Sequence, residues 1–392
     1  MKKHLLKAAA ILTIATLVNT QDVSAQGNTV DFLKTGKEDA NALINAYASP
    51  LLKSFGAGLN GGWFNTAKPH GLGGFDITFA GNITFAPTAD QSYNVGTLGL
   101  KSVKLMPGSG GTAAPTVFGS NSSADTVGLF ARYPGSTMDS LLTKLPLPPG
   151  IGLNIFALPT LQVAVGVGFG TEVAIRYFPS MNFGGVNVGM FGFAVKHDFK
   201  QWIPGMKKMP FDLSAMFGYT SFDASYKFDN LQAEKSSTTT YNANPNKVYS
   251  NQQIEFGSSA WTLNVLISKK LAIFTPYLGL GYQYANTTLK MAGDYPIIDV
   301  NPNFDYTKSY IPGPTPNPFY SPTDPNSHPK IVREFSDPIS LSGKISGMRA
   351  TMGFRLHLAI MTIHADYTFA EYNVASVGVG LNLQSIRPFH LM

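Results

Sequence analysis

From Leu72 to Gln384 the chain repeats one pattern, in which about ten residues alternate between apolar and small or polar side chains before a turn. One such segment has the apolar residues Phe75, Ile77, Phe79, Ile83 and Phe85. Another has Met348, Ala350, Met352, Phe354 and Leu356. A strand with one apolar and one polar face suits a tilted crossing of a bilayer around a watery interior. The pattern therefore predicts an all-β fold, a transmembrane antiparallel β-barrel.

The composition supports a membrane barrel over a large soluble β-sandwich. Charged residues make up 13% of the chain, whereas soluble domains average about 25%. A sandwich needs two apolar inner faces, but it does not need so many long apolar faces. After the N-terminus no run reaches the roughly 18–20 apolar residues of a membrane helix. Lipid of the outer membrane is therefore an expected partner.

The N-terminus has the features of a signal peptide. Lys2, Lys3 and Lys7 precede a short apolar core from Ala8 to Val18, and Val23-Ser24-Ala25 forms a small-residue cleavage site. We expect cleavage after Ala25 and localisation in the cell outer membrane. An uncleaved anchor is the alternative, but this apolar run is too short to span a bilayer. The sequence contains no Cys, which excludes a lipoprotein, disulfides and thiolate metal sites.

The charge of the chain gives no indication of nucleic-acid binding. Residues 1–25 contain three Lys and one Asp, so cleavage lowers the formal net charge from +6 to +4. The basic residues do not cluster with aromatic residues in one segment. We therefore exclude nucleic acid as a partner.

The alternation predicts twelve strands, an even number as in bacterial single-chain barrels. They cover 72–86, 95–106, 126–133, 160–169, 171–178, 186–197, 211–228, 254–268, 273–290, 345–357, 360–371 and 374–384. One more hairpin within 107–125 or 150–160 would give fourteen.

Loop length predicts which connections lie on which side of the membrane, because bacterial barrels have short periplasmic turns and long external loops. The connections near Gly170, 198–210, 269–272 and 358–359 are then periplasmic. Those at 134–159, 179–185, 229–253, 291–344 and 372–373 are external. The connection 107–125 falls on the periplasmic side and is too long for it. In 198–210, Trp202 predicts either an amphipathic turn at the membrane interface or a simple connection.

Residues 26–70 precede the first strand and predict a helical plug. Thr35-Gly36-Lys37-Glu38 matches a capping box. Apolar residues then recur at helical spacing up to a kink or end at Pro50, and the expected plug residues are Leu43, Ile44, Tyr47 and Phe55. Such a helix must bury its apolar face in the lumen, on the inner leaflet or on a periplasmic partner. We favour the lumen, so 71–392 would form the barrel.

The external segment 136–158 is unusually apolar for a loop. It can form a groove for a hydrophobic ligand or a surface that binds a protein. It can also cap the barrel mouth or contain a missed hairpin. The candidate ligand-binding residues are Leu141, Leu142, Leu145, Ile151, Leu153, Ile155 and Phe156.

Several ionisable residues fall on the inward side of the alternation: Glu172, Arg176, Arg349, Arg355, His357, His364 and Asp366. We expect them to line the lumen and pair across strands, with the arginines favouring anions such as a carboxylate head group. His364 and Asp366 share a face, but two ligands do not make a metal site, so no metal or other cofactor is predicted. The inward histidines and the lack of a nucleophile elbow argue against a barrel hydrolase, and we expect no enzyme.

The chain resembles a family of Bacteroidota outer-membrane barrels and, distantly, FadL-type transporters of hydrophobic compounds. The likeness rests on the signal peptide, the helical segment 29–60, the apolar external loop and the stretches 170–177 and 195–197. It implies an N-terminal hatch inside a fourteen-strand barrel and a ligand groove in the external loops. The expected function is an outer-membrane channel or transporter for small hydrophobic or amphipathic, fatty-acid-like molecules. The alternative is a membrane anchor or secretion-system carrier that binds proteins through its external loops.

Overall fold

The computed structural model describes residues 37–106, 112–122, 126–132, 139–227, 235–301, 303–304 and 320–383. The predicted signal peptide, its cleavage site and the start of the N-terminal segment at 26–36 lie outside the described residues. No described helix is long and apolar enough to cross a membrane.

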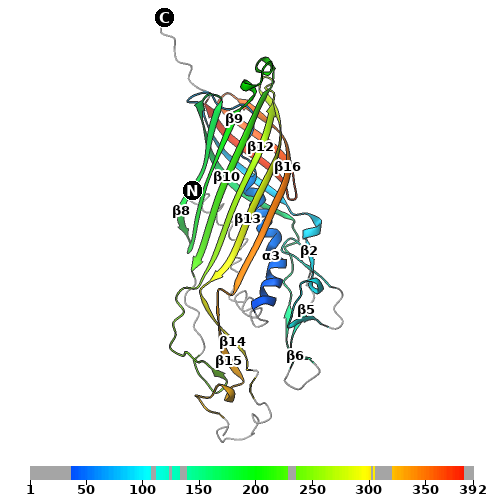
Figure 1. Ribbon diagram of the computed structural model, residues 1–392, viewed down its shortest axis with the longest axis vertical. Coiled ribbons are helices and arrows are strands. Elements are labelled where there is room, and N and C mark those ends of the chain that lie inside the picture. The colour runs from blue at the N-terminus through cyan, green and yellow to red at the C-terminus, as the bar shows by residue number, and fades with distance from the viewer. Residues whose placement is uncertain are drawn as a thin grey trace.

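Ten strands close into an antiparallel barrel (Figure 1), as the alternation predicted. β1 pairs with both β7 and β18, which closes the sheet. The barrel strands are β1 (Phe75–Phe85), β7 (Ile155–Gly168), β8 (Thr171–Phe183), β9 (Val186–Asp198), β10 (Asp212–Lys227), β12 (Gln253–Ser268), β13 (Phe274–Ala292), β16 (Ile339–Leu358), β17 (Met361–Phe369) and β18 (Asn373–Leu383).

The predicted number of twelve to fourteen strands was wrong, because 95–106 and 126–133 do not enter the barrel. They contribute to small sheets in the connection between β1 and β7. One contains β3 (Val103–Leu105), β5 (Thr126–Arg132) and β6 (Asp139–Pro146), and the other β2 (Ser92–Asn94) and β4 (Ala113–Pro115). Three residues, as in β3, extend about 10 Å and cannot cross a bilayer. Segment 86–154 is therefore one long connection, and the long connection predicted on the periplasmic side disappears.

The two ends of the barrel differ in their connections. One end, here called the short-turn end, has the connections 169–170, 199–211, 269–273 and 359–360. The other, the long-loop end, has 86–154, 184–185, 228–252, 293–338 and 370–372. For the connections that follow β7, this division matches the predicted one. Within 199–211 lie two short 3-10 helices, η3 (Lys200–Trp202) and η4 (Met206–Lys208), and Trp202 is 70% exposed.

A small sheet projects from the long-loop end, below the barrel in Figure 1. It consists of β11 (Thr240–Tyr241), β15 (Lys330–Ser336) and β14 (Asp294–Val300). Lys247 binds it through Glu334 at 2.6 Å and Asp294 at 3.2 Å, and the Tyr249 hydroxyl donates to Glu334 at 2.8 Å. The hydrogen bond from Lys247 lowers the pKa of Glu334, and hydrogen bonds from Ser336 and Lys247 lower the pKa of Asp294.

These lowered carboxyl pKa values make the sheet sensitive to acid. Such groups stabilise the fold above their unfolded-state pKa, and this contribution is lost as the pH falls through the folded-state pKa. We expect faster hydrogen exchange in 240–250 and 294–300 below about pH 4, the ordinary range of carboxyl groups. Mass spectrometry from pH 7 to pH 3, corrected for intrinsic exchange, measures this. The variant Lys247→Met should show a smaller pH effect, and an identical pH effect in the variant and the natural protein would contradict the assignment.

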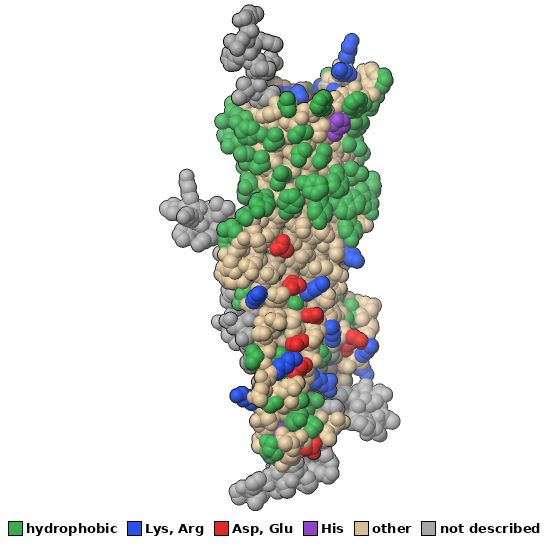
Figure 2. All heavy atoms as spheres, turned by 60° about the vertical axis from the view of Figure 1, so that its left-hand side comes forward, with side chains coloured by type: hydrophobic (Ala, Val, Ile, Leu, Met, Phe, Trp, Pro, Cys, Tyr) green, Lys and Arg blue, Asp and Glu red, His purple; other side chains and the backbone are tan. Residues whose placement is uncertain are grey.

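The outer face of the barrel is apolar only near the short-turn end. On β16 the outward residues Met348, Met352, Phe354 and Leu358 are exposed, whereas farther along the same side stand Ser340, Ser342 and Lys344. The ten steps from Met348 to Leu358, at about 3.4 Å each and tilted by about 40°, cover roughly 26 Å, which matches the apolar band of a membrane barrel. Figure 2 shows this belt beside a polar long-loop half. The barrel therefore spans the membrane with one half and extends into water with the other.

The inner face shows the opposite pattern. In the long-loop half, the inward residues Ile339, Leu341 and Ile345 of β16 form part of an apolar core. In the membrane half, Arg349, Thr351 and Arg355 of the same strand face inward and are buried. The long-loop half is thus built like a soluble protein around an apolar element.

That element is the helix α3 (Lys37–Asn60), which begins at the long-loop end and runs into the barrel (Figure 1). It continues through Pro50, so the helix does not end there, and most of it from Pro50 to Asn60 is buried. Of the predicted plug residues, Phe55 is buried in the barrel core and Ile44 packs against that core. Leu43 is buried against the small sheets of the β1–β7 connection instead, and the Tyr47 hydroxyl donates to Pro149 O at 3.0 Å.

Helix α3 also covers a free strand edge. β17 ends at Phe369, opposite Ala350, so residues 339–349 of β16 lack a strand on this side. Asn41 Oδ1 accepts from Ser340 N at 2.7 Å, and Asn45 Oδ1 accepts from Ser342 N at 3.1 Å. Two residues along a strand rise about 6.7 Å and four along a helix about 6 Å, so the spacings match. The two asparagine side chains therefore accept the main-chain hydrogen bonds that a neighbouring strand would otherwise accept.

We expect Asn41→Ala combined with Asn45→Ala to speed hydrogen exchange at Ser340 and Ser342. Each amide would lose its acceptor, at a cost of about 1–3 kcal/mol for a group left unsatisfied. Exchange mass spectrometry of a peptide covering 338–345 measures this. Asn182→Ala, at the end of β8 beside the β8–β9 turn, serves as control. Unchanged protection in the double variant would show that the asparagines do not hold this edge.

Candidate functional site: the plugged lumen

The barrel lumen is occupied by the C-terminal part of α3 and the irregular segment 61–70, here together called the plug (residues 50–70). In the long-loop half, Phe55 lies in an aromatic cluster, with ring centroids 4.8 Å from Phe222, 4.8 Å from Phe256 and 5.8 Å from Phe156. A Cβ on Gly56 would lie only 2.6 Å from the Cβ of Ala285, so glycine permits the close approach of helix and wall.

In the membrane half, small wall residues leave room for the plug. Trp63, Phe64 and Ala67 are buried among wall residues that include Ala164, Ala174 and Ala194. The plug thus fills the lumen by apolar packing even where the wall is largely polar.

Arg176 of β8 holds the end of the plug helix. This fully buried side chain donates from Nη1 to Leu59 O at 2.9 Å and from Nη2 to Gly61 O at 2.8 Å. Its Nε donates to Gln162 Oε1 at 3.2 Å, and its guanidinium lies 3.7 Å from the centre of the Trp63 ring. The planar guanidinium of Arg176 therefore donates hydrogen bonds to two main-chain carbonyls at once.

Arg349 of β16 binds the same helix end, where its Nη1 donates to Asn60 O at 2.8 Å. The last turn of α3 contains no basic residue, and the carbonyls at a helix C-terminus are unsatisfied and carry partial negative charge. The barrel wall supplies the missing cap. Farther along the lumen, Arg355 donates to Asn65 Oδ1 at 3.2 Å. Within the described part of the chain, no carboxylate forms an ion pair with any of these three arginines.

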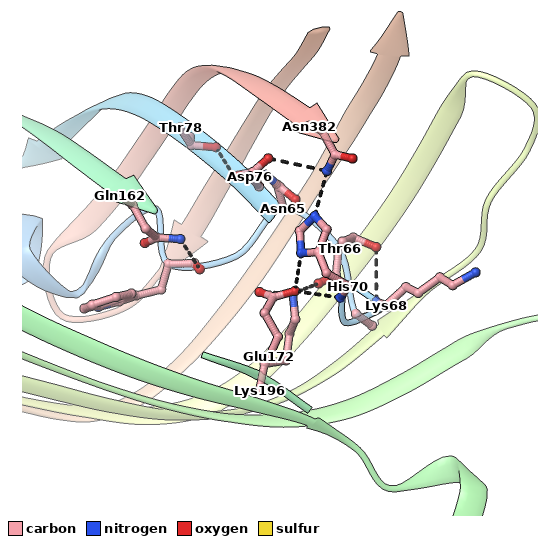
Figure 3. A network of polar contacts seen from close by, with 12 residues as sticks. Asn65, Thr66, Lys68, His70, Asp76, Thr78, Gln162, Glu172, Lys196 and Asn382 are labelled. Atoms are coloured by element: carbon pink, nitrogen blue, oxygen red, sulfur yellow. Dashed lines mark hydrogen bonds and ion pairs between the residues drawn. The ribbon is translucent and has the colours of Figure 1, made fainter. Parts of the chain in front are cut away.

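A polar network holds the other end of the plug, toward the short-turn end (Figure 3). His70 Nδ1 lies 2.7 Å from Glu172 Oε2, and the His70 main-chain N–H donates to the same oxygen at 3.0 Å. Lys196 forms an ion pair with Glu172 Oε1 at 2.9 Å. Asn382 Nδ2 lies 2.8 Å from His70 Nε2 and donates to it, which leaves the proton of a neutral ring on Nδ1. Glu172 is thereby shared between the plug and the barrel wall.

Further contacts extend this network around a small cavity. The cavity measures about 10 Å³ and is lined by residues that include Asp76, Gln162 and Glu172. This is room for about one water molecule. Thr78 donates to Asp76, and Lys196 donates to Thr66 O at 3.4 Å. A solute larger than water does not fit in this cavity beside the plug.

The predicted lumen residues do face inward, but their partners differ from those expected. Glu172, Arg176, Arg349, Arg355, His364 and Asp366 are buried, and His357 is partly buried near the short-turn end. Only the Glu172–Lys196 pair joins neighbouring strands as an ion pair among the described lumen residues. Asp366 accepts from the Tyr277 hydroxyl at 2.9 Å. No group of three described His, Asp or Glu residues is arranged to hold a metal.

The predicted ligand-binding residues do not form one surface. Leu141, Ile151, Leu153 and Ile155 are exposed, whereas Phe156 is buried and contacts Phe55 of the plug. The assignment of Phe156 to an external groove was wrong, because β7 begins at Ile155 and directs the next side chain into the lumen. The side chains of Leu142 and Leu145 lie outside the described residues.

Solved outer-membrane barrels match the chain at low identity. Ail, the attachment invasion locus protein of Yersinia pestis, matches with 8% identity and a TM-score of 0.23, covering 80% of this chain and 99% of Ail. The translocator domain of the autotransporter NalP from Neisseria meningitidis matches with 11% identity and a TM-score of 0.24, covering 96% and 100%. The outer membrane protease OmpT from Escherichia coli matches with 6% identity and a TM-score of 0.23, covering 79% and 97%. At these scores the likenesses carry no functional argument.

No curated protein matches the sequence. A family model does, over residues 1–383. The chain therefore belongs to the family of unknown function DUF6588.

Proposed function

We propose that this protein is an outer-membrane transporter for small amphipathic molecules with a carboxylate head, resembling the FadL-type transporters in this respect. The long-loop end faces the outside and the short-turn end the periplasm. One observation carries the proposal: Arg176 and Arg349 are buried in the lumen and donate to main-chain carbonyls of the plug without a described carboxylate partner.

A buried guanidinium is a costly way to hold a permanent plug, because its charge must leave water. The long-loop half holds α3 by apolar packing around Phe55. In the membrane half, the acceptors are neutral carbonyls, which bind a guanidinium less strongly than a carboxylate does. A carboxylate ligand therefore competes for the arginines and frees the end of the helix.

The external side chains Leu141, Ile151, Leu153 and Ile155 are exposed at or near the long-loop end. In this proposal they contact the apolar part of a ligand first, with Leu142 and Leu145 in the same segment. The ligand head then reaches the arginines. Segment 61–70 has to shift to let the ligand pass, because the cavity between this segment and the wall has room for about one water molecule.

A disulfide between plug and wall tests the proposal. A Cβ on Gly58 would lie 3.3 Å from the Cβ of Leu158, close to the usual disulfide range of about 3.5–4.5 Å. The chain has no cysteine of its own, so Gly58→Cys with Leu158→Cys introduces one defined pair. Liposomes containing this variant are loaded with dansylglycine, a small fluorescent amphiphile with one carboxylate. We expect release to be slow when the pair is oxidised and faster when it is reduced, with each single-cysteine variant unaffected by oxidation.

A second function is favoured by the elements that project from the long-loop end, namely β14 with β15 and β5 with β6. A closed barrel that carries such elements suits a membrane anchor or secretion-system carrier that binds proteins. Equal release from oxidised, reduced and protein-free vesicles would overturn the transport proposal and support this alternative.

A further inference from the structure

The charged side chains are distributed unevenly along the molecule. Lysines gather at the short-turn end, where Lys207 and Lys208 lie in the β9–β10 connection and Lys269 and Lys270 in the β12–β13 connection. These four residues, here called the lysine rim, are all exposed. The described acidic residues in the same two connections and at their strand ends are Asp198 and Asp212. The long-loop half carries both signs (Figure 2).

The two lysine pairs belong to neighbouring strands. β10 pairs with β12, and Asp212 stands opposite Ser268, so the two connections leave the barrel side by side. Among the described carboxylates, none forms an ion pair with a rim lysine. Asp198 is engaged locally, because its Oδ1 accepts from Lys200 N at 2.9 Å. The rim is therefore a positive surface with little local compensation.

The rim adjoins the apolar belt that faces lipid. Trp202, Met209, Leu271 and Ile273 are exposed in the same connections. The Trp202 indole donates from Nε1 to His197 Nε2 at 2.9 Å, and the two rings stack with centroids 6.3 Å apart. A fixed indole beside an apolar belt is typical of the level of lipid head groups. The lysine rim thus lies where the phosphates of one leaflet lie.

We propose that the lysine rim binds anionic phospholipid head groups in the leaflet at the short-turn end. The lysine ammonium groups pair with lipid phosphates and anionic head groups, while Trp202, Leu271 and Ile273 contact the adjoining acyl chains. The occupant is lipid rather than an acidic protein because exposed apolar side chains, Trp202, Leu271 and Ile273 among them, stand in the same two connections as the lysines. This inference does not depend on what passes through the lumen.

Tryptophan fluorescence offers a local readout. The chain has three tryptophans. Trp63 is buried in the lumen, and Trp261 stacks with Phe217 and Tyr284 at the other edge of the belt. In the Trp261→Phe background, Trp202 is the described lipid-facing indole. Quenching by brominated phosphatidylglycerol and by brominated phosphatidylcholine, each mixed into the bilayer, gives their relative binding at the rim.

We expect phosphatidylglycerol to bind about tenfold more strongly than phosphatidylcholine at low salt, because each basic residue near an anionic surface adds to the attraction. The ratio of phosphatidylglycerol to phosphatidylcholine binding should fall to about one in 1 M salt, because the electrostatic screening length there is about 3 Å. The same ratio should fall to about one in the variant that replaces all four rim lysines, Lys207→Gln/Lys208→Gln/Lys269→Gln/Lys270→Gln. The matched control Lys227→Gln/Lys290→Gln/Lys330→Gln/Lys344→Gln removes four exposed lysines from the long-loop half and should keep the preference.

Equal quenching by the two lipids in the parent protein would overturn the proposal, and so would an equal loss of preference in the control variant. Inorganic phosphate at constant ionic strength separates lipid from free anion. If phosphate abolishes the preference, the rim is a general anion site and not a lipid site. Replacing the four lysines with arginine keeps the charge, and this variant should retain the preference.

Discussion

Replacing Arg176 and Arg349 together with methionine is expected to open the lumen to ions. The two side chains donate to Leu59 O, Asn60 O and Gly61 O at 2.8–2.9 Å, so the variant leaves three carbonyls at the end of the plug helix without these donors. Each buried polar group left unsatisfied costs about 1–3 kcal/mol, and water entering the lumen is the available replacement. Current recordings in planar bilayers should show frequent channel openings in the double variant and rare ones in the natural protein.

A matched control is Arg333→Met, which removes an arginine that pairs with Asp299 at 3.3 Å on the projecting sheet. It should leave the conductance unchanged. Silent recordings from the double variant, with a barrel that still runs as a folded species on gels, would mean that the arginines do not hold the plug in place.

Phe55→Ala should cause the largest loss of stability among single changes in the plug. Its ring contacts Phe156, Phe222 and Phe256, and truncating a buried phenylalanine costs about 3–5 kcal/mol. We expect the long-loop half to lose protection first, because the membrane half is also held by lipid. Urea unfolding in lipid vesicles, followed by hydrogen exchange in 252–260 and 285–291, measures the effect.

The control for this change is Phe191→Ala, which truncates a ring on the lipid-facing side of β9. It should affect the membrane half and leave the exchange of 285–291 unchanged. Equal unfolding free energies for Phe55→Ala and the natural protein would show that the aromatic cluster is not the main contact between plug and wall.

The sequence allowed the barrel to be predicted, because a period of two fixes which side chains face lipid along a strand. The same period led to a wrong prediction at 95–106 and 126–133, where the short strands of small sheets outside the barrel also alternate. The alternation in these two segments does not indicate that β1 pairs directly with β7. At Pro50 the sequence left a kink or an end open, because proline normally ends a helix. Here the helix continues, and the barrel core buries it on both sides of that residue.

The candidate site was predictable in part. Alternation placed Arg176, Arg349 and Arg355 inside the lumen, and the structure agrees. Their acceptors are main-chain carbonyls of residues 59–61, which no side-chain pattern reveals. The contacts of His70 and Lys196 with Glu172 were not predicted for a related reason. How far the plug extends into the lumen determines which wall residues it contacts. The glycines at 61 and 62 indicate a tight turn of the chain inside the lumen, but they do not indicate which wall residues this segment contacts.

Helix α3 lies inside the barrel with Gly58 beside Leu158 of β7. The most direct test is spontaneous disulfide formation in Gly58→Cys/Leu158→Cys, assayed by thiol labelling in native membranes. The control pair Gly58→Cys/Leu161→Cys places the second thiol on the lipid-facing side of the same strand. We expect nearly complete disulfide formation in the first pair and free thiols in the second. Free thiols in both pairs would contradict a plugged lumen.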